Sequence, residues 1–345
     1  MENNIVPFTA MESMVVNGVK EHVSYTPEVG SGSAKFIGGV ILPDGRVYNV
    51  PYSNTTAAIY DPSTNTFTET PAAGNGGAKF IGGVILPDGR VYNVPYSNTT
   101  AAIYDPSTNT VTETPEVGSG SYKFAGGVIL PDGRVYNVPH FNTTAAIYDP
   151  STNTVTETPE VGNGTGKFWG GVLLPDGRVY NVPRYHSTAA IYDPSTNTVT
   201  ETPTIGSGSN KFYGGALLPD GRIYNVPYTY PYALIYDPST NTVTETPTIG
   251  SGVNRFVGAV TLPDGRIYNT PNNYTKAAIY DPSTNTFTET PVVGSGTGKF
   301  WGGVLLPDGR VYNVPFGYAK AALVSTGSYP TEAIETVTHP YFNKF

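Results

Sequence analysis

The sequence predicts an all-β protein, a seven-bladed β-propeller of 44-residue, four-stranded blades whose ring is closed by an N-terminal outer strand. The 40 glycines and 31 prolines among 345 residues exclude long helices. A Lys-Phe or Arg-Phe pair recurs every 44 residues, and each complete unit holds four strand-like segments. Radial repetition of four-stranded units is typical of propellers, whereas a solenoid, the alternative, would need capping ends.

The first hairpin of unit 1 is predicted from its turn. Lys35 to Leu42 is apolar and rich in β-prone residues, and Arg46 to Val50 is a second such segment. Between them lies Pro43-Asp44-Gly45, in which glycine supplies the positive φ that a tight turn requires. We expect the second strand to end at Pro51, because proline has no N–H to donate to a strand ladder.

The second hairpin of the unit follows after a short loop. Thr56 to Tyr60 is the third predicted strand, and Asp61 to Asn65 is a turn whose side chains can cap backbone amides. Thr66 to Thr70 alternates polar and less polar residues, which is typical of a half-exposed strand. Its hydroxyls and carboxylate discourage pairing with another sheet, so we place it at the outer edge.

The phase of the repeat predicts how the ring closes. Unit 7 has three strands and lacks the Tyr-Asp-Pro turn, whereas residues 22–27 match a fourth strand in phase. We therefore expect an N-terminal arm (1–21), a propeller (22–327) and a C-terminal tail (328–345). Residues 334–340 also resemble a fourth strand, so the C-terminal segment is a competing source of the closing strand.

Composition excludes several classes of function. Without cysteine there are no disulfides, thiolate metal sites or cysteine nucleophiles. A net charge of −8 argues against nucleic acid as a partner. No segment has the 18 apolar residues of a membrane span, and the N-terminus lacks a signal-peptide pattern, so we expect a soluble chain with no membrane insertion. The compartment stays open, and the irregular termini are expected to make assembly contacts.

The repeat resembles kelch-type blades. The similarity lies in the runs from Gly39 to Tyr48 and from Ala58 to Thr66. The fuller pattern Gly-Gly-Val-x-Leu-Pro-Asp-Gly-Arg-Val-Tyr is similar to the highly repetitive propellers of phage, giant-virus and microbial genomes. That resemblance implies the propeller fold and a virion-associated or cell-surface setting, and it implies no established activity.

No pattern typical of an enzyme stands out. Repeated aspartates belong to turns and repeated glutamates to outer strands, so we predict no catalytic carboxylate pair. The chain has four histidines, and only His140 and His186 lie on equivalent loops, without metal-ligand spacing. We therefore predict no catalytic residues, no metal and no cofactor.

The residues that differ most between the seven units lie at two positions of the repeat. These are the loop between the second and third strands and the residue that follows each Lys/Arg-Phe pair, and both are expected on one face of the disc. Aromatic residues there suit stacking on sugar rings or anchoring a protein; simple drift is the alternative. The candidate residues for binding a protein partner or glycan are Tyr52, Tyr96, His140, Phe141, Trp169, Tyr185, His186, Tyr213, Tyr228, Tyr230, Tyr274, Trp301 and Tyr318.

The repeated cations form a second candidate site. If the first strand is innermost, they make a positive ring at one channel mouth that could hold an anion on the axis. The alternative is that each pairs with a carboxylate or lies in solvent. The residues are Lys35, Lys79, Lys123, Lys167, Lys211, Arg255 and Lys299.

Together these observations predict a non-enzymatic structural or binding module, such as a virion or cell-surface scaffold or attachment protein. The alternatives are a lectin-like propeller that uses its aromatic loops and a designed or consensus-like symmetric scaffold. A kelch-type enzyme is the least favoured interpretation.

Overall fold

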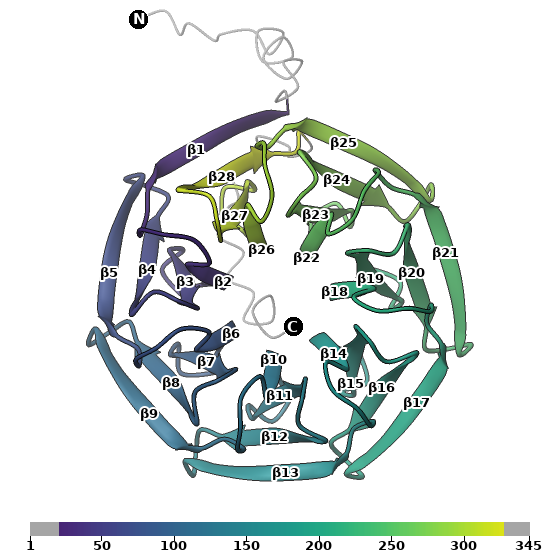
Figure 1. Cartoon of the computed structure of the whole chain (residues 1–345), viewed down its shortest axis with the longest axis horizontal. Coiled ribbons are helices and arrows are strands. Elements are labelled where there is room, and N and C mark those ends of the chain that lie inside the picture. The colour runs from purple at the N-terminus through teal and green to yellow at the C-terminus, as the bar shows by residue number, and fades with distance from the viewer. Residues whose placement is uncertain (1–20, 328–345) are drawn as a thin grey trace, which may run out of the picture.

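The computed structural model describes residues 21–327, which form a ring of seven four-stranded antiparallel sheets around a central axis (Figure 1). Blades 1 to 3 contain β2 (Phe36–Ile41), β3 (Val47–Pro51), β4 (Thr56–Asp61), β5 (Thr66–Ala72); β6 (Phe80–Ile85), β7 (Val91–Pro95), β8 (Thr100–Asp105), β9 (Thr110–Glu116); β10 (Phe124–Ile129), β11 (Val135–Pro139), β12 (Thr144–Asp149) and β13 (Thr154–Glu160). Blades 4 and 5 contain β14 (Phe168–Leu173), β15 (Val179–Pro183), β16 (Thr188–Asp193), β17 (Thr198–Thr204); β18 (Phe212–Leu217), β19 (Ile223–Pro227), β20 (Tyr232–Asp237) and β21 (Thr242–Thr248). Blade 6 contains β22 (Phe256–Thr261), β23 (Ile267–Pro271), β24 (Lys276–Asp281) and β25 (Thr286–Val292), and blade 7 contains β26 (Phe300–Leu305), β27 (Val311–Pro315), β28 (Lys320–Ser325) and β1 (His22–Glu28).

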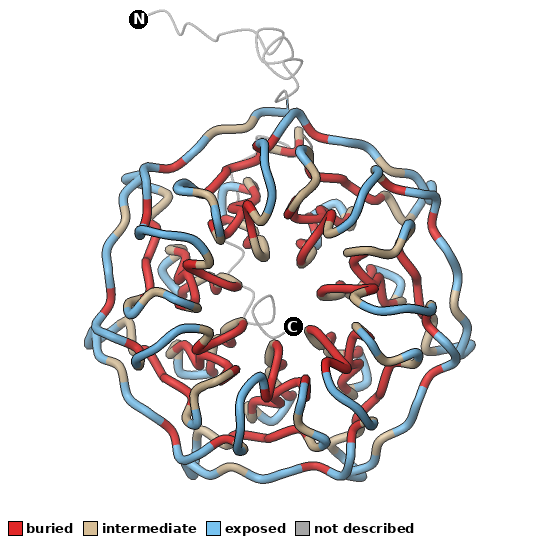
Figure 2. Tube along the Cα trace, viewed as in Figure 1, coloured by how far each residue is buried: buried red, intermediate tan, exposed pale blue. Residues whose placement is uncertain are grey.

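Each blade runs from a buried inner strand to an exposed outer strand (Figure 2). All five residues of β3 are buried, whereas β5 buries one residue of seven. The apolar core is divided into clusters that fill the space between neighbouring blades, so blade 1 packs its Val50 and Ile59 with Phe80 and Tyr104 of blade 2. The sheets therefore stabilise one another face to face, as the alternation of the sequence predicts.

Both predicted turns are confirmed. The Asp44 carboxylate accepts a hydrogen bond from the Arg46 backbone N–H at 3.1 Å, and Gly45 has a φ of +86°. In the other turn the Asp61 carboxylate accepts one from the Ser63 backbone N–H at 2.8 Å. Asn65 there has a positive φ of 54°, a conformation that asparagine tolerates better than most residues.

The second strand ends at Pro51, as predicted, whereas the outer strand extends further than the predicted Thr70. β3 includes Pro51, whose Cα pairs with that of Phe36, and β5 continues past Pro71 to Ala72. The register shifts within this outer pairing, between Thr56 and Ala58, and the strand lies at the sheet edge. An edge strand at a register shift can include proline because its outward side needs no N–H donors.

The N-terminal strand closes the ring, as predicted. β1 pairs antiparallel with β28, with Tyr25 opposite Ala322. The hydroxyl of Thr26 accepts a hydrogen bond from the Ala321 backbone N–H at 3.0 Å, and Thr158 does the same for Ala145 within blade 3. β1 therefore reproduces a contact that the other outer strands make. The competing segment 334–340, the tail and residues 1–20 of the arm lie outside the described residues.

The second glycine of the Gly-Gly pair allows neighbouring blades to approach closely. A Cβ on Gly39 would lie 2.7 Å from a methyl carbon of Val304 in the preceding blade, which is too close for two carbon atoms. Blade 6 carries Ala259 at the equivalent position, and there the preceding blade carries Ala216 in place of the valine. The methyl group added at Ala259 is compensated by those missing at Ala216, so the contact requires a constant total side-chain volume rather than particular residues.

A belt of polar contacts also links the blades. Tyr92 in β7 donates its hydroxyl to the side-chain oxygen of Asn137 in the next blade at 3.1 Å. The amide nitrogen of Asn137 donates in turn to the Ala146 carbonyl at 3.0 Å. Equivalent bonds continue from blade 3 to blade 7, and Tyr312 of blade 7 returns to Asn49 of blade 1 at 3.0 Å. Between blades 1 and 2 no such bond joins Tyr48 to Asn93. These buried polar groups are thus used to fix blade to blade.

Candidate ligand-binding face

One face of the disc carries nearly the same residues in every blade, and the other carries residues that vary from blade to blade. On one, which we call the turn face, shallow hollows between neighbouring blades are lined by repeated residues such as Asp88, Arg90 and Asp105. On the other, the variable face, the loops between second and third strands meet the beginnings of the inner strands. Contacts between Tyr213 and Tyr228 and between Trp301 and Phe316 show that both variable positions share this face.

The first residue of each variable loop lies toward the axis. These residues and those following each Lys/Arg-Phe pair form a cluster at the channel mouth, the central aromatic cluster, which crosses from blade to blade. The Trp169 ring centroid is 4.7 Å from that of Tyr213 and 5.8 Å from that of Trp301. Six candidate residues contact one another here, and His140 joins them through Tyr96 and Trp169; the six are Tyr52, Tyr96, Trp169, Tyr213, Tyr228 and Trp301.

The second loop residue faces solvent in several blades. Phe141 and Tyr185 are 39% and 42% exposed, which is unusual for large aromatic side chains. Tyr122, in the loop before β10, is 44% exposed and lies edge-on to Phe141, with ring centroids 5.5 Å apart. These three rings are the exposed aromatic residues of the variable face in blades 3 and 4.

The third loop residue packs back on its own blade. The rings of Tyr230, Tyr274 and Tyr318 lie 5.3 to 5.5 Å from the phenylalanine that starts the inner strand. His186 lies 5.5 Å from Phe168 in the same way, and Asn54 occupies this place in blade 1, beside Gly30. Four of the candidate residues therefore support the loops rather than line the mouth.

The repeated lysines hold the variable loops by their backbone. The ammonium group of Lys299 donates to the carbonyls of Asn272, Tyr274 and Gly296 at 2.8, 2.9 and 3.0 Å. In every case the lysine bonds the third loop residue of the preceding blade and the glycine three positions before itself. We call this set the clamp lysines: Lys35, Lys79, Lys123, Lys167, Lys211 and Lys299.

The clamp argues against the expected anion ring. All six clamp lysines are buried, and their ammonium donors are directed at carbonyl oxygens rather than at the axis. The alternative expectation also fails, since none of the six pairs with a carboxylate of the described residues or lies in solvent. Burial lowers the pKa of Lys299 to about 8. The sequence could not show this role because the partners are main-chain atoms.

Arg255 departs from the clamp. It is buried like the lysines, yet its Nε and Nη2 atoms have no hydrogen-bond partner among the described residues. Burial lowers its pKa, with the neighbouring Tyr224 and Tyr274 hydroxyls acting in the opposite direction. The planar guanidinium is larger than an ammonium group and does not reproduce its contacts with the carbonyls in this loop.

Arg184 and His140 are held together beside the axis. His140 is 1% exposed, and its Nδ1 lies 2.9 Å from the Phe168 carbonyl, so Nδ1 carries the proton. Its Nε2 then accepts a hydrogen bond from Nη1 of Arg184 at 3.0 Å. Burial lowers the pKa of His140 to about 4, so the ring is neutral at physiological pH and can accept this bond.

The candidate residues missed Arg184 and Tyr122. Arg184 lies in a variable loop, but the candidates there were chosen among aromatic residues and histidines, so it was not included. A usable signal was that it is the sole cation at its loop position in seven units. Tyr122 replaces the Ala34 and Ala78 of units 1 and 2 just before the clamp lysine, so comparison of units at that position could have found it.

Histidines and carboxylates do not converge in the described part of the chain. His186 bonds Thr188 on its own loop, whereas His140 bonds Arg184. Within residues 21–327 there is no group of three or more His, Asp or Glu side chains placed to hold a metal ion. The same residues include no helix of the length and hydropathy needed to cross a membrane.

Comparison with known proteins shows the fold. No protein-family model matches the chain, and no curated protein matches it in sequence. A catalytically inactive virginiamycin B lyase from Staphylococcus aureus, solved with quinupristin, has a TM-score of 0.77 at 15% identity, covering 89% of this chain and 99% of the lyase. A streptogramin B lyase gives 0.76 at 13% identity, covering 89% and 98%.

A sensor domain is similar as well. The extracellular domain of a one-component system, described as putative, from B. thetaiotaomicron matches with a TM-score of 0.68 at 13% identity, covering 89% of this chain and 40% of that one. A lyase and a sensor domain have different activities, so the likeness carries no function across. The chain is a seven-bladed β-propeller built from tandem repeats, like these structures.

Proposed function

We propose that the protein is a non-enzymatic binding module that attaches to glycans through its variable face. The proposal takes up the lectin-like alternative of the sequence analysis, within the broader prediction of a non-enzymatic binding module. The virion or cell-surface setting belongs to the same proposal and rests on the resemblance of the repeats to kelch-type and virus-encoded propellers.

The observation that carries the proposal is that the clamp lysines hold the backbone of the variable loops while the loop side chains differ from blade to blade. Lys211 holds the loop of blade 4 through the carbonyls of Arg184 and His186, at 3.3 and 2.7 Å. Contacts with main-chain atoms are independent of side-chain identity, so the side chains that face the mouth can change while the loop keeps its shape. A rigid framework that presents varied side chains is the arrangement expected of a recognition surface.

The chemistry of this surface favours sugars. Exposed rings such as Phe141 and Tyr185 offer flat apolar faces, and the same loop position carries a hydroxyl in Thr229 of blade 5 and an amide in Asn273 of blade 6. Aromatic rings with few rotatable bonds contribute contact area at a small entropic cost. Apolar faces among neutral hydrogen-bonding groups match the mixed surface of a sugar ring.

The test is binding of the full chain to a microarray of neutral and acidic glycans. We expect saturable binding that the Tyr185→Ala variant loses. Tyr25→Ala is the matched control, because Tyr25 is also 42% exposed but lies on outer strand β1. Absence of saturable binding, or equal binding by the two variants, would overturn the glycan-binding proposal.

A second measurement addresses the non-enzymatic part. Quinupristin, the compound present in the lyase structure, is incubated with the protein and followed by chromatography. We expect it to remain unchanged over hours at micromolar protein. Conversion to a new product by the chain, in proportion to protein concentration, would contradict the proposal.

A further inference from the structure

We propose that Arg184 is the specificity-determining residue of the variable face and that it binds the carboxylate of an acidic sugar. The acidic sugar belongs to the class of hexuronic and sialic acids. This inference rests on the glycan-binding function proposed above and names the kind of glycan. It stands on the geometry of one guanidinium, the distribution of charge around it and the exposed rings beside it.

The contacts of Arg184 fix the guanidinium and leave part of it unused. Its Nε–H is directed at the Asn210 side-chain oxygen, at 3.0 Å, and at the Tyr213 hydroxyl, at 2.7 Å. Nη1 bonds His140, and Nη2 bonds the Tyr185 hydroxyl at 3.3 Å. A guanidinium has five N–H groups, so one on each terminal nitrogen has no partner among residues 21–327.

Aromatic rings surround the same group. The guanidinium carbon lies 4.3 Å from the ring centroid of Tyr185, 5.1 Å from that of Tyr213 and 5.3 Å from that of Trp169. Cation–π contacts at these distances stabilise the charge and hold the plane of the guanidinium. The faces of the group are thus used by the protein, and its two remaining donors lie at the edge, which is the part that pairs with a carboxylate.

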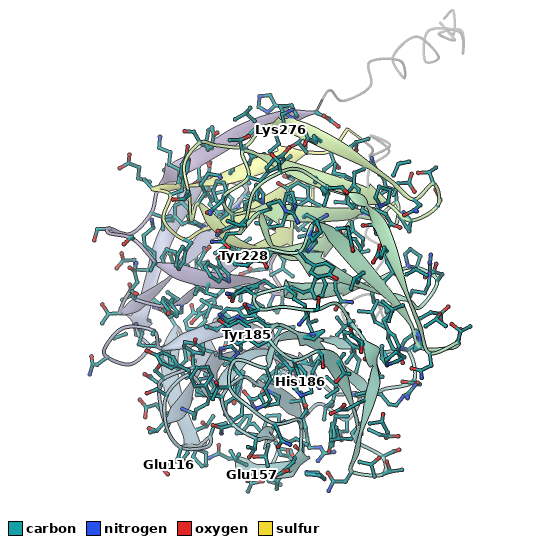
Figure 3. All side chains as sticks on the ribbon, turned by 45° about the vertical axis from the view of Figure 1, so that its right-hand side comes forward. Glu116, Glu157, Tyr185, His186, Tyr228 and Lys276 are labelled. Atoms are coloured by element: carbon teal, nitrogen blue, oxygen red, sulfur yellow. The ribbon has the colours of Figure 1, made fainter. Side chains whose placement is uncertain are left out.

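The surroundings contain no competing carboxylate. The ion pairs of the described residues are the Asp–Arg pairs of the turn-face hairpins and one between Lys276 and Glu289 on blade 6. Arg184 belongs to none of them, and neither do the clamp lysines or Arg255. Figure 3 shows Tyr185 and Tyr228 near the middle of the disc and Glu116 and Glu157 at its edge.

This arrangement leaves unpaired positive charge near the middle of the variable face. The net charge is −8, yet the cations nearest the mouth lack anionic partners. A partly buried, unpaired guanidinium attracts an anion more strongly than an exposed one, because water screens it less. An anion that fits the two free donors of Arg184 completes the hydrogen bonding of the group.

The exposed rings indicate that the anion is carried by a sugar. Tyr185 stands against the loop before Lys167, since a Cβ on Gly166 would lie 2.7 Å from its ring. The ring is therefore fixed next to the guanidinium and remains 42% exposed. Phe141 and Tyr122 continue the exposed aromatic surface on blade 3. A sugar chain stacked on these rings can place one acidic residue at Arg184.

The experiment compares pairs of glycans that differ by one carboxylate. Glucuronic acid-terminated and glucose-terminated oligosaccharides form one pair, and sialylated and desialylated oligosaccharides form another. Kd is measured by isothermal titration at 50 and 300 mM salt. We expect the carboxylated member of at least one pair to bind tenfold or more tightly at low salt, and the preference to decrease at high salt. A sulfated and a phosphorylated glycan serve as further arms.

The matched variant is Arg184→Tyr, because Tyr52, Tyr96 and Tyr228 occupy the equivalent position in three other units. The fold therefore already accommodates tyrosine at this place, and thermal unfolding of the variant checks it. We expect the variant to lose the preference for the carboxylated glycan and to keep its affinity for the neutral one. Arg184→Lys, which retains charge without the paired donors, is expected to keep less than a third of the preference.

The outcomes separate the inference from the proposed function. Equal affinity for both members of each pair overturns the inference while glycan binding itself stands. A preference that persists in Arg184→Tyr also overturns it, because another group would then read the carboxylate. Stronger binding of the sulfated or phosphorylated glycan shows that the site prefers a different anion and overturns the assignment to carboxylates. Failure to bind any glycan overturns the proposed function as well.

Discussion

Replacing Lys299 by methionine tests whether the clamp lysines hold the variable loops. Methionine keeps most of the aliphatic length but removes all three hydrogen bonds that Lys299 makes, at 2.8 to 3.0 Å. The carbonyls of Asn272, Tyr274 and Gly296 then lose their charged donor. The matched control is Lys320→Met, because Lys320 is exposed on β28.

The expected magnitude follows from the carbonyls. A buried acceptor without a partner costs about 1–3 kcal/mol, and bonds from charged donors are worth about 1.5–3 kcal/mol each. Two effects reduce the sum: the loop can turn a carbonyl toward water, and the lysine no longer has to be desolvated. We therefore expect the free energy of unfolding to decrease by roughly 2–4 kcal/mol, which lowers Tm by about 3–6 °C in a domain of this size.

Calorimetry and hydrogen exchange provide the assay. Calorimetry gives Tm for both variants, and hydrogen exchange locates the change in the loop that begins at Asn272. We expect faster exchange in that loop and unchanged exchange in the equivalent loop of blade 3. Equal Tm values for Lys299→Met and Lys320→Met would refute the argument that the ammonium supports the loop. Uniform acceleration around the ring would refute its local character.

Three further predictions concern pH, ring closure and packing. Burial lowers the pKa of Lys79, Lys123, Lys167, Lys211 and Lys299 to about 8, so between pH 8 and about 10 the unfolded chain binds more protons than the folded chain, and the urea midpoint should rise with pH. Above that range the midpoint should fall, because burial raises the pKa of tyrosines such as Tyr92. A midpoint that decreases from pH 8 to 9.5 would contradict the lowered pKa of the clamp lysines. Thr26→Val removes the acceptor of the Ala321 N–H and should destabilise by about 1–3 kcal/mol in chemical denaturation, as Thr158→Val should in blade 3; a much smaller effect at Thr26 would mean that β1 contributes less than the other outer strands. Gly127→Ala places a Cβ 2.8 Å from methyl carbons of Val84 and Val94 and should cost about 1–3 kcal/mol, and a double-mutant cycle with Val84→Ala should show a favourable coupling, whereas simple additivity would disprove the compensation seen at Ala216 and Ala259.

The fold could be predicted because its information is local and repeated. Asp44-Gly45 and Asp61-Pro62 each specify a turn within a few residues, and their seven and six copies make the signal unmistakable. Closure by β1 followed from phase alone, since Thr26 stands where the outer-strand threonine of every other unit stands. The end of the outer strand was predicted less accurately, since β5 continues past Pro71, because the effect of a proline depends on which side of the strand faces a neighbour.

The site could be predicted only in outline. Repeat comparison located the variable face, but the three adjacent residues of a loop take different directions. Tyr185 is exposed, whereas Tyr230, equally variable, packs on Phe212. The role of the lysines was hidden because their partners are carbonyl oxygens, which every residue possesses.

The Tyr–Asn belt gives each blade the same two connecting surfaces. Whatever its loops contain, a blade offers a tyrosine hydroxyl to one neighbour and an asparagine amide to the other, as Tyr92 and Asn137 do. One unit can therefore replace another in the ring, and its loop residues move with it. Duplication or recombination of units within the gene can move the Arg184 loop to another place in the ring, or copy it, without redesigning any interface. The recognition surface of such a protein can change by rearrangement of whole units as well as by point substitution.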